Sequence, residues 1–184
     1  AMRVARAAVA RKDQGVVGLD LAGDEVHFPA ANFKSVFDYA QQQGLHITIH
    51  AGEAAGPESI RQALDVCHAE RIGHGVRLGE DPALLQEVAR RGITLEMCPD
   101  SNLLINVVKD LKSYPLPAYV EVGVPVVVST DDRHIFNLTM VGEYMALAEN
   151  CGLSLQDLQR ISLAGIRCSF LPEAEKTALE ARWH

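Results

Sequence analysis

The sequence has no CxxC pair, no long apolar run and no cluster of basic residues. Its four cysteines, Cys67, Cys98, Cys151 and Cys168, are widely spaced, so they predict reduced, mostly buried thiols and neither a sulfur-only zinc cage nor a disulfide framework. No run approaches the roughly 20 apolar residues that span a bilayer. The first six residues lack the apolar core of a secretion signal. These absences favour a cytoplasmic protein without a membrane partner.

An excess of positive charge is also missing. The formal net charge is −7 at pH 7, and no basic stripe offsets it. Because nucleic-acid binding depends on clustered Lys and Arg that neutralise phosphates, a nucleic-acid partner is disfavoured. The 184 residues, 48% of them hydrophobic, are enough for one sizeable core and too few for two comfortable domains. We therefore predict a single domain over residues 1–184.

What the sequence does contain is a repeated alternation of strand-type and helix-type segments. The predicted strands cover residues 16–21, 45–49, 71–74, 93–97 and 124–128, and the predicted helices cover residues 4–11, 32–43, 57–68, 82–91, 117–122, 139–150, 154–168 and 173–182. The last strand has β-branched residues on both faces, which suits a parallel sheet covered by helices on each side. The pattern predicts the α/β class, either as a barrel or as an open doubly wound sheet.

The number of predicted strands decides between these architectures only in part. A closed (β/α)8 barrel has eight strands and typically needs ~250 residues. Five predicted strands in 184 residues fall about three strand–helix units short of that. The sequence therefore predicts either an open sheet or the C-terminal portion of a larger barrel.

Two strand ends carry side chains of the metal-binding type. His50 follows the run Leu45–Ile49, and Asp131 follows the run Val124–Val128 with a second acid, Asp132, directly behind it. Imidazole and carboxylate are usual ligands of a catalytic zinc, and α/β enzymes build their sites at strand ends. A lone strand-end histidine is often structural, and an Asp pair is often a helix N-cap. Their joint occurrence at like positions favours a metal site.

Glu53, His74 and Gly23 are the other candidate site residues. Glu53 lies on the loop after the first of these strands, where a carboxyl near a metal can keep its proton and act as a general acid; alternatively it is a charge at a helix N-terminus. His74, flanked by glycines, is expected to be accessible and to orient a water. Gly23 offers a backbone N–H to a flat ring or is a simple turn glycine. No role is assigned to the other histidines, of which His134 is the reserve candidate: His27, His46, His68, His134 and His184.

Five motifs together resemble the adenosine deaminase family of metal-dependent hydrolases. Their order and spacing agree with the family, and the similarity continues through Ser169-Phe170-Leu171-Pro172. The motifs are Asp20-Leu21-Ala22-Gly23-Asp24-Glu25, His50-Ala51-Gly52-Glu53, Arg71-Ile72-Gly73-His74-Gly75, Cys98-Pro99-Asp100-Ser101-Asn102 and Ser129-Thr130-Asp131-Asp132.

The resemblance implies a (β/α)8 barrel with one zinc at the C-terminal ends of its strands, held by two histidines of a His-x-His together with His50 and Asp131. It also implies that hydroxide attacks C6 of the purine while Glu53 protonates N1 and His74 orients and stabilises the hydroxide. Asp132 would hydrogen-bond N7 of the substrate, and the backbone of Gly23 would meet N3. Ammonia then leaves, and adenosine becomes inosine.

The chain departs from the family pattern in two places. It contains no His-x-His, and Arg133 follows the acidic pair where the family usually has proline. The chain thus resembles the last five strand–helix units of the family's barrel. Because a partial barrel exposes sheet edges and apolar surface, we expect it to pair with a second copy or with an N-terminal segment. The alternatives are a deaminase of adenine or of another aminopurine derivative, and a non-catalytic half-barrel that assembles with another chain.

Overall fold

The computed structural model describes residues 1–183 and consists of two compact units, Ala1–Leu84 and Leu85–His184. His184, one of the histidines without a predicted role, lies outside the described residues. Each unit is α/β in class, and the single domain predicted over residues 1–184 stays a prediction. None of the helices within residues 1–183 combines the length and the apolarity that crossing a bilayer would take.

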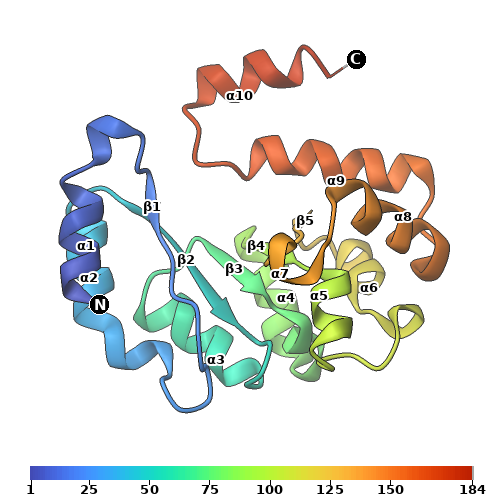
Figure 1. Ribbon diagram of the computed structural model, residues 1–184, viewed down its shortest axis with the longest axis horizontal. Helices are drawn as coiled ribbons and strands as arrows, with labels where there is room; N and C mark the ends of the chain where they lie inside the picture. The colour runs from blue at the N-terminus through green and yellow to red at the C-terminus, as the bar shows by residue number, and fades with distance from the viewer. Residues whose placement is uncertain (184) are drawn as a thin grey trace. The chain divides into compact units, whose positions relative to one another are not determined.

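The first unit contains three parallel strands with helices between them (Figure 1). Strand β1 pairs with β2 so that Gly18 lies opposite His46, and β2 pairs with β3 so that His50 lies opposite Gly73. Because β2 and β3 are parallel, their C-terminal ends lie together at one edge of the sheet. The elements are α1 (Met2–Val9), β1 (Gly18–Leu19), α2 (Lys34–Gln42), β2 (His46–Ala51), α3 (Pro57–Arg61) and β3 (Arg71–His74), with 3-10 turns at Lys12–Gln14, Ala30–Phe33 and Val76–Glu80.

The alternation of buried and half-buried residues along β2 determines the face on which His50 lies. Burial alternates along it: Ile47, Ile49 and Ala51 are at most 1% exposed, whereas the residues between them are half-buried. Helix α2 packs on β2 and contributes buried apolar residues to the same core, Phe37 among them. Each fully buried side chain of this size stabilises the fold by about 1.5–3 kcal/mol. Because side chains alternate along a strand, His50 lies on the opposite face.

The second unit pairs two parallel strands and surrounds them with helices. Strand β4 pairs with β5, with Leu95 opposite Val126 and Met97 opposite Val128. Helices α8 and α9 pack on β5, and α10 packs on α9 (Figure 1). The elements from the border of the units onward are α4 (Pro82–Arg91), β4 (Thr94–Met97), α5 (Pro99–Leu104), a 3-10 turn at Leu111–Ser113, α6 (Leu116–Val122), β5 (Val126–Val128), α7 (Arg133–Phe136), α8 (Met140–Cys151), α9 (Leu155–Arg167) and α10 (Glu173–Glu180).

Most predicted segments are confirmed, and the differences have local causes. The strand at Arg71–His74 and the helix at Pro82–Arg91 have the predicted bounds, and Ser154 caps α9 in a reciprocal capping box with Asp157. The helix predicted to continue to residue 68 is wrong beyond Arg61, because the chain widens into a π-helix at Gln62–Val66, which an apolar period does not distinguish from an α-helix. Helices α5 and α7 were not predicted because each is too short to show a period.

Candidate active site

His50 is the next-to-last residue of β2 and contacts a carboxylate from the end of β1. Its Nδ1 lies 3.1 Å from Oδ2 and 3.2 Å from Oδ1 of Asp20. Gly73, its neighbour on β3, leaves room for the ring, since a Cβ at that position would lie 3.0 Å from Nδ1 of His50. A histidine whose Nδ1 is held by a carboxylate presents Nε2 in a fixed direction, which is the arrangement typical of a metal-binding imidazole.

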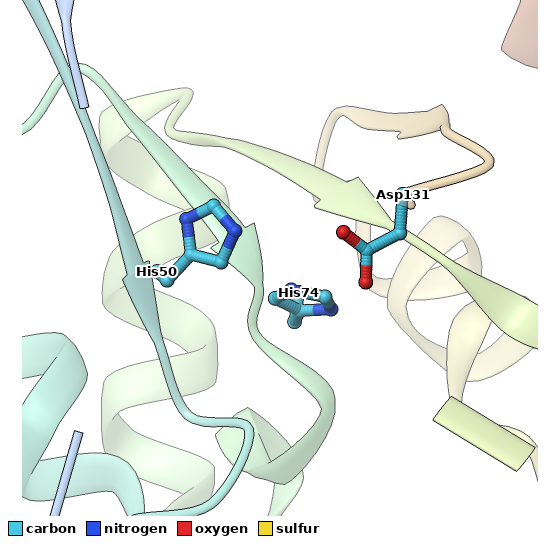
Figure 2. Close-up of side chains that lie close together, drawn as sticks. All are labelled: His50, His74 and Asp131. Carbon is cyan, nitrogen blue, oxygen red and sulfur yellow. The ribbon is translucent and has the colours of Figure 1, made fainter. Parts of the chain in front are cut away.

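His74 ends β3 and contacts the predicted acid. Its Nδ1 lies 3.1 Å from Oε1 of Glu53, and its ring stands edge-on to that of His50 with the centroids 4.9 Å apart (Figure 2). The expectation that His74 is accessible was wrong: its side chain is only 2% exposed. Its backbone is left-handed, with φ +63°, an unusual conformation for a residue with a side chain and one that concentrates at functional sites.

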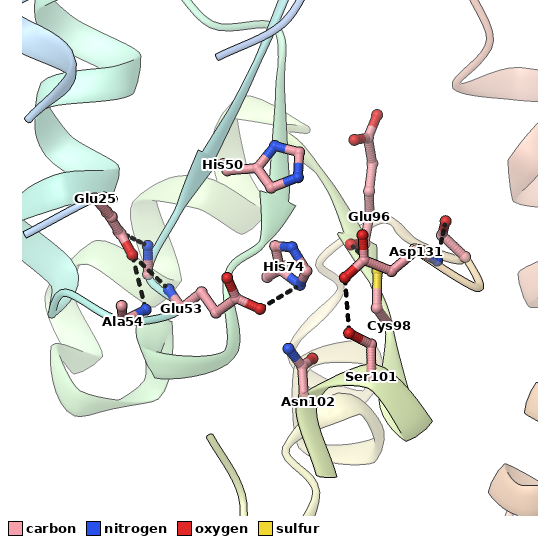
Figure 3. Close-up of polar contacts among 12 residues, drawn as sticks. Glu25, His50, Glu53, Ala54, His74, Glu96, Cys98, Ser101, Asn102 and Asp131 are labelled. Carbon is pink, nitrogen blue, oxygen red and sulfur yellow. Dashed lines mark hydrogen bonds and ion pairs between the residues drawn. The ribbon is translucent and has the colours of Figure 1, made fainter. Parts of the chain in front are cut away.

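Glu53 lies on the loop Gly52–Ala55, and a second carboxylate holds this loop from its amide side. Glu25 accepts hydrogen bonds from the backbone N–H groups of all four loop residues. Figure 3 shows Glu25 facing the backbone of Glu53 and Ala54. The sequence did not single out Glu25. Its place at the end of the motif Asp20–Glu25 was the available signal, but the amides that it binds lie 27 to 30 residues further along the chain.

Gly23 lies beside a pocket in the first unit. Its φ is +129°, and a Cβ there would meet no atom within 4 Å, so its backbone is open to approach. The pocket has a volume of about 170 Å³, and its lining includes Gly23, His50 and the aromatic rings of Phe28 and Phe33. It therefore combines an apolar wall with a backbone edge and the predicted metal-binding imidazole.

Asp131 belongs to the second unit, where its carboxylate is also oriented by a neighbour. Ser101, at the start of α5, donates its hydroxyl to Oδ2 of Asp131 over 2.7 Å (Figure 3). The backbone of Asp131 is left-handed, with φ +53°. Asp132 is exposed at the N-cap of α7 but makes no side-chain capping bond, so the pair does not act as the capping device that was its alternative interpretation.

Glu143 is a buried acid of the second unit that the sequence did not single out. It lies on α8, is 0% exposed, and accepts a hydrogen bond from the backbone N–H of Asp100 over 3.1 Å. Its other oxygen, Oε1, has no hydrogen-bond partner among the described residues. Desolvation, aided by the nearby charges of Asp100 and Asp131, raises the pKa of Glu143 from 4.5 to about 7. The carboxyl is thus largely protonated at mildly acidic pH.

The predicted residues form two groups, one in each unit. The first unit brings His50, Glu53 and His74 together at neighbouring strand ends, with Gly23 on the loop after β1. The second unit carries Asp131 and Asp132 at the loop after β5. His50 and Asp131 are each of a type that binds metal ions, because imidazole and carboxylate groups oriented by a hydrogen bond to another side chain are common metal ligands.

Comparison with known proteins identifies the family. The family model described as adenosine deaminase matches residues 1–183. An adenosine deaminase of Klebsiella pneumoniae is 43% identical over 176 residues, which are 96% of this chain and 53% of that protein. An adenosine deaminase of Escherichia coli is 43% identical over 174 residues, 95% of this chain and 52% of that protein. The chain therefore spans about half the length of the curated relatives it matches.

Solved structures agree with this assignment. The adenine deaminase of Arthrobacter aurescens superimposes with a TM-score of 0.89 at 30% identity, over 97% of this chain and 57% of its own. The N6-methyl-AMP deaminase of Arabidopsis thaliana gives a TM-score of 0.89 at 26% identity, over 99% of this chain and 53% of its own. The fold is thus that of part of a TIM-like deaminase barrel. With the strand-end histidines, the paired acids and the match over almost its whole length, the chain belongs to the adenosine deaminase family.

Proposed function

We propose that this chain carries the catalytic half of a zinc-dependent hydrolase that converts adenosine and water to inosine and ammonia. The observation that carries the proposal is the cluster at the ends of β2 and β3, where Glu53 contacts His74 and His74 lies against His50. A carboxyl and an imidazole in contact beside a metal-binding imidazole supply proton transfer and metal binding at one place.

His50 and Asp131 are the residues of this chain that we propose as zinc ligands. Support comes from family membership and from the two hydrogen bonds that orient these side chains, from Asp20 and from Ser101. When bound, zinc supplies Lewis acidity, which lowers the pKa of water to ~7 and makes hydroxide available at neutral pH. A catalytic zinc commonly has three or more protein ligands, so the remaining ligands are expected outside this chain.

Glu53 and His74 are proposed to handle the protons of the reaction. Glu53 donates its carboxyl proton to N1 of the purine, which makes C6 more electrophilic. His74 orients the water-derived nucleophile that adds to C6. The proton of the added O–H then passes to the amino group, the C6–N bond breaks to release ammonia, and C6=O forms. The burial of His74 supports this role, because a water-excluded imidazole holds a defined direction.

Gly23 and Asp132 are proposed to bind the purine, the former through its backbone at N3 and the latter through its carboxylate at N7. The pocket beside Gly23, with Phe28 and Phe33 in its lining, suits a flat aromatic ring. Free adenine is the second candidate substrate, because the Arthrobacter aurescens adenine deaminase is 30% identical with a TM-score of 0.89. Comparing kcat/KM for adenosine and for adenine separates the two.

The proposed partner is a second copy of the chain or an N-terminal segment that completes the barrel. The chain's coverage of about half of its relatives supports this proposal. Measuring the molar mass in solution tests the first form. The second form is tested by fusing to the chain the part of the Escherichia coli relative that lies outside the matched region. A non-catalytic assembling module is the rival, and it predicts that neither form binds zinc or deaminates adenosine.

The decisive experiment compares three variants with the unsubstituted protein, measuring zinc content and the decrease in adenosine absorbance that accompanies deamination. Glu53→Gln should leave zinc content unchanged and lower kcat by about 10²–10⁴, since the amide does not donate the required proton in the same way. His50→Ala should lose both zinc and activity. Glu58→Gln is the control, because Glu58 is an exposed acid on α3 nearby and its loss should change neither. Full turnover in Glu53→Gln would remove Glu53 from the acid role.

A further inference from the structure

Residues distant in sequence form hydrogen bonds with both the N–H groups and the carbonyl groups of the loop that carries Glu53. On the amide side, Oε1 of Glu25 accepts a hydrogen bond from the backbone N–H of Gly52 over 2.5 Å. Oε2 of Glu25 accepts hydrogen bonds from the backbone N–H groups of Glu53, Ala54 and Ala55 over 3.2, 2.8 and 2.9 Å. Consecutive backbone N–H groups that point inward form a concave binding site for an anion, and here the carboxylate of Glu25 fills it (Figure 3).

On the carbonyl side, Arg77 binds the same loop. Its backbone N–H donates to the carbonyl of Gly52 over 2.8 Å, and its Nη1 donates to the carbonyl of Ala54 over 2.9 Å. Glu80 fixes the guanidinium through bonds of 2.8 Å and 3.0 Å to Nε and Nη2. The charge of Glu25 also raises the pKa of Arg77, after the larger effect of Glu80, so the two groups attract each other across the loop.

Gly52 makes this tight arrangement sterically possible. Its backbone is left-handed, with φ +69°, and a Cβ there would lie 2.5 Å from Cδ1 of Ile60. The hydroxyl of Ser59 accepts a further bond from the Gly52 amide over 2.8 Å. The backbone next to Glu53 therefore has little freedom, and the direction in which the Glu53 side chain leaves the loop is set by these contacts.

We propose that Glu25 is a positioning residue for the reaction: its carboxylate holds the Gly52–Ala55 loop so that Glu53 stays in contact with His74. The inference deepens the proposed deaminase function and rests on it for its catalytic part. Because Glu25 lies two residues after Gly23, the loop proposed to meet the purine is tied to the loop that carries the acid. Substrate at Gly23 and proton donation by Glu53 are coupled through one carboxylate.

Glu25→Gln is the test variant, and Glu58→Gln is the matched control. Glutamine keeps one acceptor oxygen and replaces the other by an NH₂ group, which faces N–H donors and repels them. Amide hydrogen exchange measured by mass spectrometry should be at least tenfold faster at residues 52–55 in Glu25→Gln and unchanged in Glu58→Gln. Unchanged exchange at residues 52–55 in a folded Glu25→Gln protein would overturn the proposal.

A spectroscopic readout separates positioning from general weakening of the fold. In the unsubstituted protein, the imidazole N–H of His74 that points to Glu53 should give a slowly exchanging, downfield proton signal in ¹⁵N-edited NMR spectra. We expect this signal to disappear in Glu53→Ala, which removes the acceptor, and in Glu25→Gln, and to persist in Glu58→Gln. Its persistence in Glu25→Gln would refute the positioning role. Arg77→Gln, which removes only the Nη1 bond to the loop, is the milder second variant should Glu25→Gln fail to fold, and it should speed exchange at residues 52–55 by less.

Kinetics then test the catalytic part. In a preparation that deaminates adenosine, Glu25→Gln should lower kcat by about 10–100-fold with little change in KM, because a small displacement of a catalytic group costs rate rather than binding. An unchanged kcat would refute the coupling to catalysis. No turnover in the unsubstituted protein would refute the proposed function instead, while hydrogen exchange and the NMR signal would still decide the role of Glu25.

Discussion

Replacing Gly52 by alanine tests the link between local backbone geometry and the position of the acid loop. Two separate costs are expected. A side chain in the left-handed region costs about 1–2 kcal/mol, and Gly52 has φ +69°. The new Cβ would also lie 2.5 Å from Cδ1 and 2.8 Å from Cγ1 of Ile60. Overpacking of this kind costs about 1–3 kcal/mol, so Gly52→Ala should lower the free energy of unfolding by about 2–5 kcal/mol in all.

A control glycine separates these two costs. Gly15 also has a positive φ, +93°, and lies in the same unit, but a Cβ there would meet nothing within 4 Å. Gly15→Ala should therefore show the backbone cost alone, about 1–2 kcal/mol. The difference between the two variants reports the contact with Ile60. Urea unfolding followed by circular dichroism gives both free energies by linear extrapolation.

A double-mutant cycle identifies the contact directly. Ile60→Val removes Cδ1, the atom nearest to the new Cβ, and by itself costs about 0.5–1.5 kcal/mol. In the Gly52→Ala background it removes the nearer of the two clashing atoms and should relieve part of the strain, so the interaction free energy between the two substitutions should exceed about 1 kcal/mol. Equal losses in Gly52→Ala and Gly15→Ala, with an interaction free energy near zero, would refute the steric argument.

Three further outcomes follow from the structure. Glu143 has a pKa raised to about 7, so the folded state favours its protonated form. At about 1.4 kcal/mol per pH unit, the free energy of unfolding should fall by up to about 3 kcal/mol as the pH rises from 4.5 to about 7. Glu143→Gln should remove this pH dependence. An identical pH profile in Glu143→Gln would contradict the role of Glu143. Gly73→Ala should lower zinc affinity about 10–100-fold, because the new Cβ would press on the ring of His50, a proposed ligand. Gly165→Ala should leave zinc affinity unchanged, because a Cβ at Gly165 would meet nothing within 4 Å. Competition with a chromogenic chelator measures the zinc affinity of both variants. Ser154→Ala should lower the free energy of unfolding in urea by about 1 kcal/mol, because it removes the N-cap of α9. Ser35 is exposed, so Ser35→Ala should change that free energy by no more than about 0.5 kcal/mol. Equal losses in the two variants would exclude a stabilising role for the cap.

Sequence alone determined the features that depend on near neighbours. Apolar runs bounded by glycine and proline predicted the strands, and the strand ends predicted His50 and Asp131 as candidate ligands. Glu53 follows His50 by three residues, so the two were bound to share one strand end wherever β2 lay. The capping box of Ser154 and Asp157 was likewise local, because both partners lie in one helical turn.

Tertiary structure decided the contacts that orient these residues. Glu25 reaches amides 27 to 30 residues away, and Ser101 reaches the carboxylate of Asp131 across 30 residues. His74 is also buried and has a left-handed backbone, and its residue type predicts neither feature. Hydrophobic periodicity reports which face of an element is buried, but it carries no information on which distant loop folds against which. That choice depends on packing and on backbone hydrogen bonds formed only when the chain is folded, and it is what brings Glu53 within 3.1 Å of His74.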